Sequence, residues 1–242
     1  MEALPVYIFL LSIGASFVQR TVGFGFGIFI MTMLPFLMPS YGEATTLSGL
    51  LAMTTSAVIV YKMRHYLNWR KLTVILATFI VISSFCIFCL KRMDDILLRK
   101  ILGVVLVLIS IYFTFFSQRI KIPSTRPYQV GAGILSGIMG GFFGMQGPPA
   151  VLYFISTSRD KNEYMALVQT YFLCGNLMMT MVRAYNGFLT STVGIDYVYG
   201  LGGVAIGTIL GAYVFTHIPN RIFRYFVYGY IAVSGIIIFC TV

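Results

Sequence analysis

Long apolar stretches dominate the chain of 242 residues, and they constrain its fold more than any other feature. A single crossing of a bilayer needs about 20 mostly apolar residues. The polar connections between the stretches are too short to form a soluble domain. We therefore expect an all-α polytopic membrane protein. Its eight predicted segments are residues 3–39, 43–62, 71–90, 97–117, 129–157, 164–183, 193–216 and 223–241.

Composition and charge support this class and exclude others. Hydrophobic residues make up 58% of the chain and charged residues 10%, whereas a soluble domain carries about a quarter charged residues. Apolar runs such as 101–116 do not alternate as barrel strands do. The net charge of +10 lies mostly in loops, where basic residues orient membrane helices. We therefore expect the lipid bilayer, and not nucleic acid, as the surroundings of this chain.

Two of the segments are too long for one crossing. Residues 3–39 would span about 55 Å as a helix and residues 129–157 about 43 Å, against a hydrocarbon core of about 30 Å. Glycine clusters interrupt both, at 23–27 and at 140–147. Because glycine has low helix propensity, we expect each segment to be broken or re-entrant there. Prolines favour the first helical turn, so we expect the second leg of 129–157 to begin at Gly147.

The two broken segments each open a block of four, which indicates an internal duplication. Adding 121 to a residue number in the first half matches Gly23 with Gly144. We expect residues 1–117 and 129–242 to be the two repeats, with 118–128 as the linker. If each broken segment returns to the side it entered from, the repeats have opposite orientations in the membrane.

The distribution of basic residues favours this fold-back topology. It gathers eleven basic residues on one side and leaves five on the other, whereas single crossings would divide them eight against eight. Because basic loops stay in the cytoplasm, we expect a multi-pass protein of the cell membrane with both termini outside the cytoplasm.

The glycine-rich breaks are the first candidates for a binding site. A helix that begins inside the membrane directs free backbone N–H groups and a positive dipole end at one point, which suits an anion. The alternative is that the glycines only let helices pack closely. For Gly203, Gly207 and Gly211, spaced at i+4, we expect packing. The expected site residues are Gly23, Gly25 and Gly27 in the first break, and Gly144, Gln146, Gly147 and Pro148 in the second.

Arg20, beside Gln19, is the most deeply placed ionisable candidate in the sequence. Ionisable groups inside an apolar stretch are costly, so its charge either pairs with an anionic substrate or reaches the membrane interface by extending its side chain. Both interpretations remain open from the sequence, and we place Gln19 and Arg20 among the candidate substrate-binding residues.

One predicted helix carries a polar stripe. Gln169, Asn176, Thr180 and Arg183 lie near one face, at i, i+7, i+11 and i+14. Such a stripe either lines a solute path or holds helices together by hydrogen bonds. We place Gln169 and Asn176 among the candidate substrate-binding residues.

The usual catalytic and metal-binding patterns are missing from the sequence. The acids number seven, no HExxH or GxSxG motif is present, and Cys86 and Cys89 form a lone CxxC without nearby histidines. We expect no enzyme activity, no metal and no cofactor. The alternatives are a scaffold subunit, or a sulfur-relay enzyme that uses Cys174 as its nucleophile.

The sequences around the two breaks resemble a known family. SFVQRTVGFGFG at 16–27 and GILSGIMGGFFGMQGPPAVLYF at 133–154 are similar to the paired motifs of the sulfite exporter TauE/SafE family, and HYLNWR at 65–70 resembles a loop of that family. The similarity covers essentially the whole chain. Two positions depart from the family pattern, because Arg20 stands where a small residue is common and Gln146 where a glycine is common.

The resemblance implies a permease with two inverted bundles that moves small sulfur-containing anions, such as sulfite or organosulfonates, out of the cytoplasm. We accordingly expect a secondary transporter that works by alternating access on a small anionic solute, as a monomer or a homodimer. The family motifs match this chain at Gln19, Gly23, Gly25, Gly27, Gly144, Gly147, Pro148 and Pro149.

Overall fold

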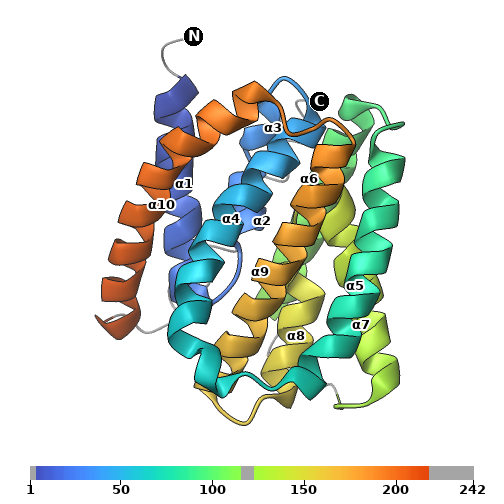
Figure 1. The fold of residues 1–242 in the computed structure, drawn as a ribbon, viewed down its shortest axis with the longest axis vertical. Helices are drawn as coiled ribbons and strands as arrows, with labels where there is room; N and C mark the ends of the chain where they lie inside the picture. The colour runs from blue at the N-terminus through green and yellow to red at the C-terminus, as the bar shows by residue number, and fades with distance from the viewer. Residues whose placement is uncertain (1–3, 116–122, 218–242) are drawn as a thin grey trace.

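The computed structural model describes residues 4–115 and 123–217, and in these ranges the regular structure is helical. The predicted segment 223–241 lies outside the described residues. Figure 1 shows the helices side by side in one bundle. They are α1 (Leu4–Val22), α2 (Phe26–Ile30), α3 (Leu34–Leu37), α4 (Tyr41–Met63), the 3₁₀ turn η1 (Arg64–Tyr66), α5 (Trp69–Leu90), α6 (Asp95–Phe115), α7 (Arg126–Phe143), α8 (Gly147–Thr157), α9 (Lys161–Tyr185) and α10 (Ser191–His217).

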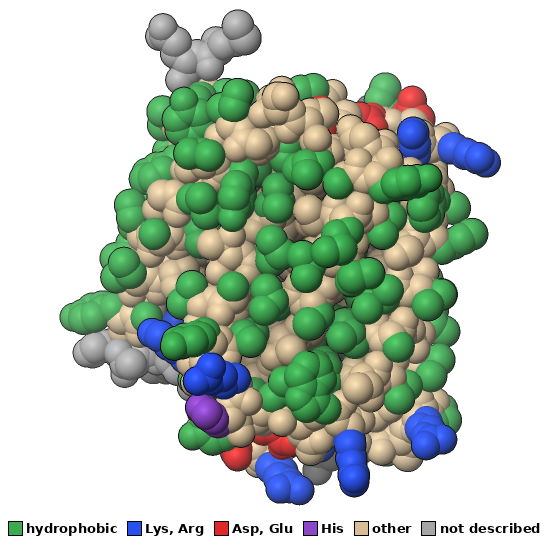
Figure 2. Space-filling view, viewed as in Figure 1, with side chains coloured by type: hydrophobic (Ala, Val, Ile, Leu, Met, Phe, Trp, Pro, Cys, Tyr) green, Lys and Arg blue, Asp and Glu red, His purple; other side chains and the backbone are tan. Residues whose placement is uncertain are grey.

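Helices of membrane-spanning length make up most of the bundle. Among the described residues, five are long and apolar enough to cross a bilayer. Hydrophobic side chains cover the middle of the visible face, while charged side chains gather toward its two ends (Figure 2). The expected all-α, multi-pass membrane class is confirmed. The candidate spans are Leu4–Thr21, Tyr41–Tyr66, Trp69–Leu90, Asn162–Tyr185 and Ser191–Val214.

The first long segment reverses direction at its glycines, as its excess length predicted. Helix α1 ends at Val22, and α2 begins at Phe26 after the N-cap residue Gly25. Helix α2 then runs back along α1, since Phe29 lies against Gly14. The return leg is itself split into α2 and α3, which the sequence did not predict.

The second long segment reverses in the same manner. Gly144 ends α7 in the left-handed conformation, and α8 begins at Gly147, the predicted start of the second leg. The amide of Gln129 near the start of α7 donates to the hydroxyl of Tyr153 in α8 at 2.8 Å, so the two legs are antiparallel.

Helix α7 begins at Arg126 with Thr125 as its N-cap residue, so it includes the last three residues of the predicted linker 118–128. Pro127 lies in the first turn of this helix, where its missing N–H has no partner to lose.

Small residues join the outer helices in pairs. Gly203, Gly207 and Gly211 of α10 lie against the backbone of α1, and Gly133, Gly137 and Gly141 of α7 lie against the backbone of α5. Close approach of backbones at small residues is the usual packing of membrane helices. The packing role expected for the α10 glycines is confirmed.

The central pair, α4 and α9, is antiparallel. Gly42 at the start of α4 lies against Phe188, just beyond the end of α9. At the other end of α9, Glu163 forms an ion pair of 2.8 Å with Lys71 near the start of α5, the helix that follows α4 across η1. Glu163 also accepts from the backbone N–H of Arg159 at 2.7 Å, so it helps to cap α9.

Candidate functional site

The two glycine-rich breaks meet in the interior of the bundle. Gly27, in the first turn of α2, faces the carbonyl oxygen of Gly144 so closely that a Cβ atom on Gly27 would overlap it. A cavity of about 30 Å³ lies at this junction, and residues of α4 and α9 also line it. Seven of the eleven predicted site residues line it: Gln19, Gly25, Gly27, Gly144, Gln146, Gly147 and Asn176.

Three of the remaining predicted residues lie beside the cavity. The side-chain amide of Gln169, which is completely buried, donates to the carbonyl oxygen of Gly23 at 2.8 Å. Gln169 also accepts from Gln19 at 3.1 Å. Pro148 is buried in the first turn of α8, directly after the cavity-lining Gly147.

Arg20 is not brought to this cavity. It lines a second cavity of about 170 Å³ between α1, α4 and α10, together with Lys62. Neighbouring residues on a helix point about 100° apart, so Gln19 and Arg20 cannot both face the centre of the bundle. In the structure, Gln19 faces the central cavity, while Arg20 faces the second cavity between α1, α4 and α10.

A chain of neutral amides joins three helices beside the cavity. The amide nitrogen of Gln19 in α1 donates to the hydroxyl of Ser56 in α4 at 3.0 Å and to Gln169 in α9. Because Gln169 in turn donates to Gly23, the first break is tied to α9 through two side chains. These bonds satisfy buried polar groups that would otherwise be costly in the membrane.

The two helix starts supply different numbers of backbone donors. In α2 the first N–H group that bonds back within the helix is that of Phe29, which donates to Gly25 at 2.9 Å. The N–H groups before it lack an intrahelical acceptor. In α8, Pro148 and Pro149 carry no N–H group. The site therefore receives most of its backbone donors from the first break.

The second break is braced by side chains. The hydroxyl of Ser136 in α7 donates to the carbonyl oxygen of Gln146, and Tyr171 in α9 donates to Ser136 at 2.7 Å. The amide nitrogen of Gln146 donates to the Phe172 carbonyl at 3.3 Å. Its other side-chain atom, Oε1, is buried without a partner at the cavity. The side chain of Gln146 therefore ties the second break to α9 through its nitrogen, and its Oε1 has no hydrogen-bond partner.

Arg183 is a buried cation that is not among the site residues predicted from the sequence. Its side chain is completely buried in the bundle. One terminal nitrogen donates to the carbonyl oxygen of Thr45 at 3.0 Å, and the other to those of Gly140 at 2.9 Å and Gly141 at 3.3 Å. The last two belong to the C-terminal turn of α7, where the helix dipole favours a cation.

The charge of Arg183 has no carboxylate partner in the parts of the chain that the structure describes, where the only ion pair is that of Lys71 with Glu163. Its position in the polar stripe of α9 was the available signal.

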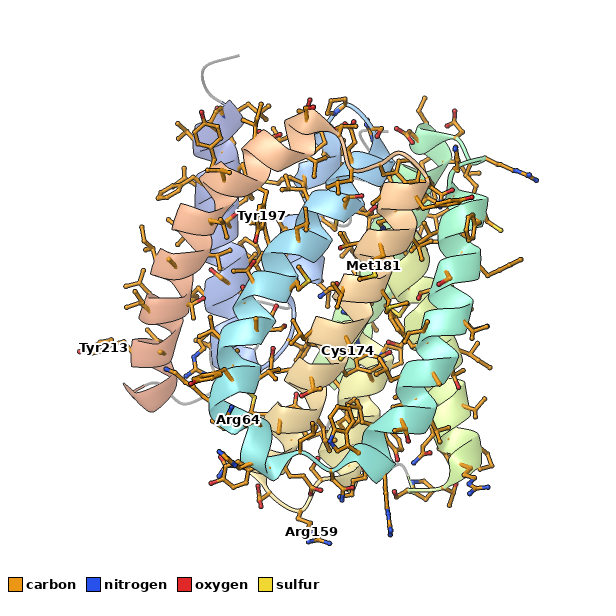
Figure 3. The ribbon with its side chains drawn as sticks, viewed as in Figure 1. Arg64, Arg159, Cys174, Met181, Tyr197 and Tyr213 are labelled. Atoms are coloured by element: carbon orange, nitrogen blue, oxygen red, sulfur yellow. The ribbon has the colours of Figure 1, made fainter. Side chains whose placement is uncertain are left out.

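The cysteine alternative gains no support from this geometry. Cys174 lies on α9 between the cavity-lining residues Phe172 and Asn176, but is not itself among the lining residues (Figure 3). Within residues 4–115 and 123–217, no group of three or more histidine, cysteine or acidic side chains could hold a metal ion.

Comparison with known proteins gives a consistent result. The family model described as "Sulfite exporter TauE/SafE" matches residues 8–238. A relative named "Probable sulfite/organosulfonate exporter TauE", from Cupriavidus necator, is 23% identical over 212 residues, which cover 84% of this chain and 80% of that protein. No solved structure matches. The family and this relative are exporters and not enzymes, as the sequence predicted for this chain.

Proposed function

Since the chain belongs to the sulfite exporter TauE/SafE family, we propose that it exports sulfite or a small organosulfonate across the cell membrane. The observation that carries this proposal is the meeting of two helix starts at one cavity. Both α2 and α8 begin there, with Gly25 and Gln146 as their N-cap residues. Two positive dipole ends directed at one buried point favour a negative charge.

The lining chemistry fits a small oxyanion. The cavity is bordered by three side-chain amides, by glycine backbone and by apolar side chains such as Phe26 and Phe172, and no carboxylate is among its described lining residues. Amide N–H groups donate to sulfite or sulfonate oxygens without a fixed countercharge, which allows release as well as binding. A volume of about 30 Å³ holds about two waters. The cavity must therefore widen to admit the anion.

Alternating access is the mechanism that we propose for this widening. Each outer helix of the first repeat packs against a helix of the second repeat, since α1 pairs with α10 and α5 with α7. Helices α4 and α9 lie antiparallel in the centre. This pairing supports two inverted repeats, residues 1–117 and 129–242, that rock around the junction of the breaks.

The orientation proposed for the protein follows from its basic loops. Arg64 and Arg159 lie at the same end of the bundle in Figure 3, the end at which α4 finishes and α9 begins. By the positive-inside rule this end faces the cytoplasm, and the start of α1 lies on the opposite side.

Efflux from proteoliposomes tests the proposal. Vesicles with the purified protein would be loaded with sulfite, a short alkylsulfonate, sulfate or chloride, and efflux followed with and without a pH gradient. We expect sulfite or the sulfonate to leave faster than from empty vesicles, and sulfate and chloride not to. Absence of flux for every anion, with folded protein in both orientations, would favour the scaffold alternative.

A further inference from the structure

Three polar atoms of α9 converge on one glycine of α4. From the point where a Cβ atom of Gly49 would lie, the nearest side-chain atoms are Arg183 Nη1 at 3.5 Å, Thr180 Oγ1 at 3.5 Å and Asn176 Oδ1 at 3.8 Å. A cation, a hydroxyl and an amide thus surround the Cβ position of Gly49 at van der Waals distance. We call these four residues the Gly49 notch.

The notch has unused hydrogen-bonding capacity. A guanidinium carries five N–H donors. Arg183 uses its two terminal nitrogens on backbone carbonyls, but its Nε is buried without a partner, and so is the hydroxyl of Thr180. Both side chains are at least nine-tenths buried. A buried polar atom without a partner is costly, so these two donors are available to a ligand or a water.

The charge balance of the notch points to an anion. A buried arginine inside a membrane is costly, and such residues pair with a counter-charge or line a substrate path. Backbone carbonyls stabilise Arg183 in part, but no described carboxylate neutralises it. Asn176 is shared between the two places, since it lines the central cavity and lies beside Gly49.

We propose that the Gly49 notch is a second subsite for the transported sulfur oxyanion, next to the cavity between the two breaks. This inference rests on the proposed export function and adds the fixed charge that the cavity lacks. Arg183 and Thr180 donate to the oxyanion, and Asn176 passes it between the subsite and the cavity. In the competing structural explanation, Arg183 only ties α4 to the end of α7.

Substitution of Gly49 by alanine separates the two explanations. A Cβ at this position meets its neighbours at ordinary contact distances of 3.5 Å or more, so the helix keeps its place. Alanine also favours the helix over glycine. We expect the Gly49→Ala variant to keep or gain thermal stability, while the sulfite concentration for half-maximal efflux rises about tenfold, because the methyl group fills the notch.

The matched control is Gly131→Ala, a helical glycine of α7 with no atom within 4 Å of its Cβ position. We expect its efflux to equal that of the wild type. If Gly49→Ala also has the wild-type half-saturation concentration, the subsite is refuted while the export function stands. If the wild type itself moves no sulfur anion, the export function fails and the subsite with it.

Charge substitutions at Arg183 give a second measurement. Equilibrium binding of radiolabelled sulfite to purified protein in detergent would be compared for Arg183→Lys and Arg183→Gln. Lysine keeps the charge but loses the fork of the guanidinium. We expect lysine to retain weakened binding and glutamine to abolish it. Equal sulfite affinity of folded glutamine and lysine variants would contradict the proposal.

Discussion

The two glycine-rich breaks occupy matching places in the two halves of the chain, but they are built differently. The first has two left-handed glycines, Gly23 at φ 89° and Gly25 at φ 105°, followed by a helix of five residues. The second has one, Gly144 at φ 68°, followed by a helix of eleven residues that has prolines at its second and third positions. The first break therefore supplies backbone N–H groups to the cavity, while the second forms a more rigid wall of the same cavity.

The side chains that hold the two breaks in place also differ. The first break is held through the amides of Gln19 and Gln169. The second is held by Ser136 and Gln146. The comparison predicts that changes at the first break affect anion transport most, whereas changes in the support of the second affect stability first.

The largest effect is expected where the breaks touch. Gly27→Val places a branched side chain against the carbonyl of Gly144, for which the backbone must shift. We expect loss of export and a loss of stability of about 1–3 kcal/mol, as in overpacked cores. Thermal unfolding and efflux measure the two effects. Gly147→Ala, whose Cβ would lie 3.5 Å or more from its neighbours, should unfold near the wild-type temperature.

The amide chain at the first break comes next. Gln169→Leu leaves the carbonyl of Gly23 and the amide of Gln19 without one partner each. We expect sulfite efflux at subsaturating concentration to fall about tenfold. An unsatisfied buried polar group costs about 1–3 kcal/mol, and about 1.4 kcal/mol of lost binding free energy corresponds to a factor of ten in affinity. Gln129→Leu breaks a buried amide bond to Tyr153 away from the cavity. If both variants lose transport equally, the amide chain has no special part in export.

A smaller effect is expected in the support of the second break. Ser136→Ala removes the donor to the Gln146 carbonyl and the acceptor for Tyr171. We expect a loss of stability of about 1 kcal/mol, with the half-saturation concentration of sulfite unchanged within twofold. Tyr171→Phe should behave alike. A change in affinity without a change in stability would reverse the assigned roles of the two breaks.

The smallest effect is expected at Arg20. Because Arg20 lines the cavity on the flank with Lys62, Arg20→Ala should change sulfite half-saturation no more than Arg126→Ala does. Parallel efflux titrations of both variants decide the point. A selective loss of affinity in Arg20→Ala would restore the sequence-based interpretation of this residue as part of the site.

The sequence predicted those features that depend on local chemistry. The breaks followed from excess helical length together with glycine, and the start of α8 at Gly147 followed from its prolines. The cavity lined by Gln19, Gly27 and Gln146 lies at the same glycine clusters, and its role as a binding site stays a prediction.

Features that depend on tertiary geometry could not be predicted in this way. The rotation of α1 decides whether Gln19 or Arg20 faces the centre, and only packing against α4 and α10 sets that rotation. The burial of Arg183 depends on the carbonyls at the end of α7, which are 42 residues or more away in sequence. The split of the return leg into α2 and α3 is different, because Pro35 in the first turn of α3 is a local signal for a new helix that our prediction did not use.

The central claim is that the transported anion binds where the two breaks meet. A cryo-electron microscopy map of the protein with selenite, a heavier analogue of sulfite, tests it most directly. The account predicts density within hydrogen-bonding distance of Gln19, Gln146 or the backbone of Gly27, continuing toward Asn176. Selenite density only in the cavity of Arg20 and Lys62, with the junction of the breaks empty, would contradict it.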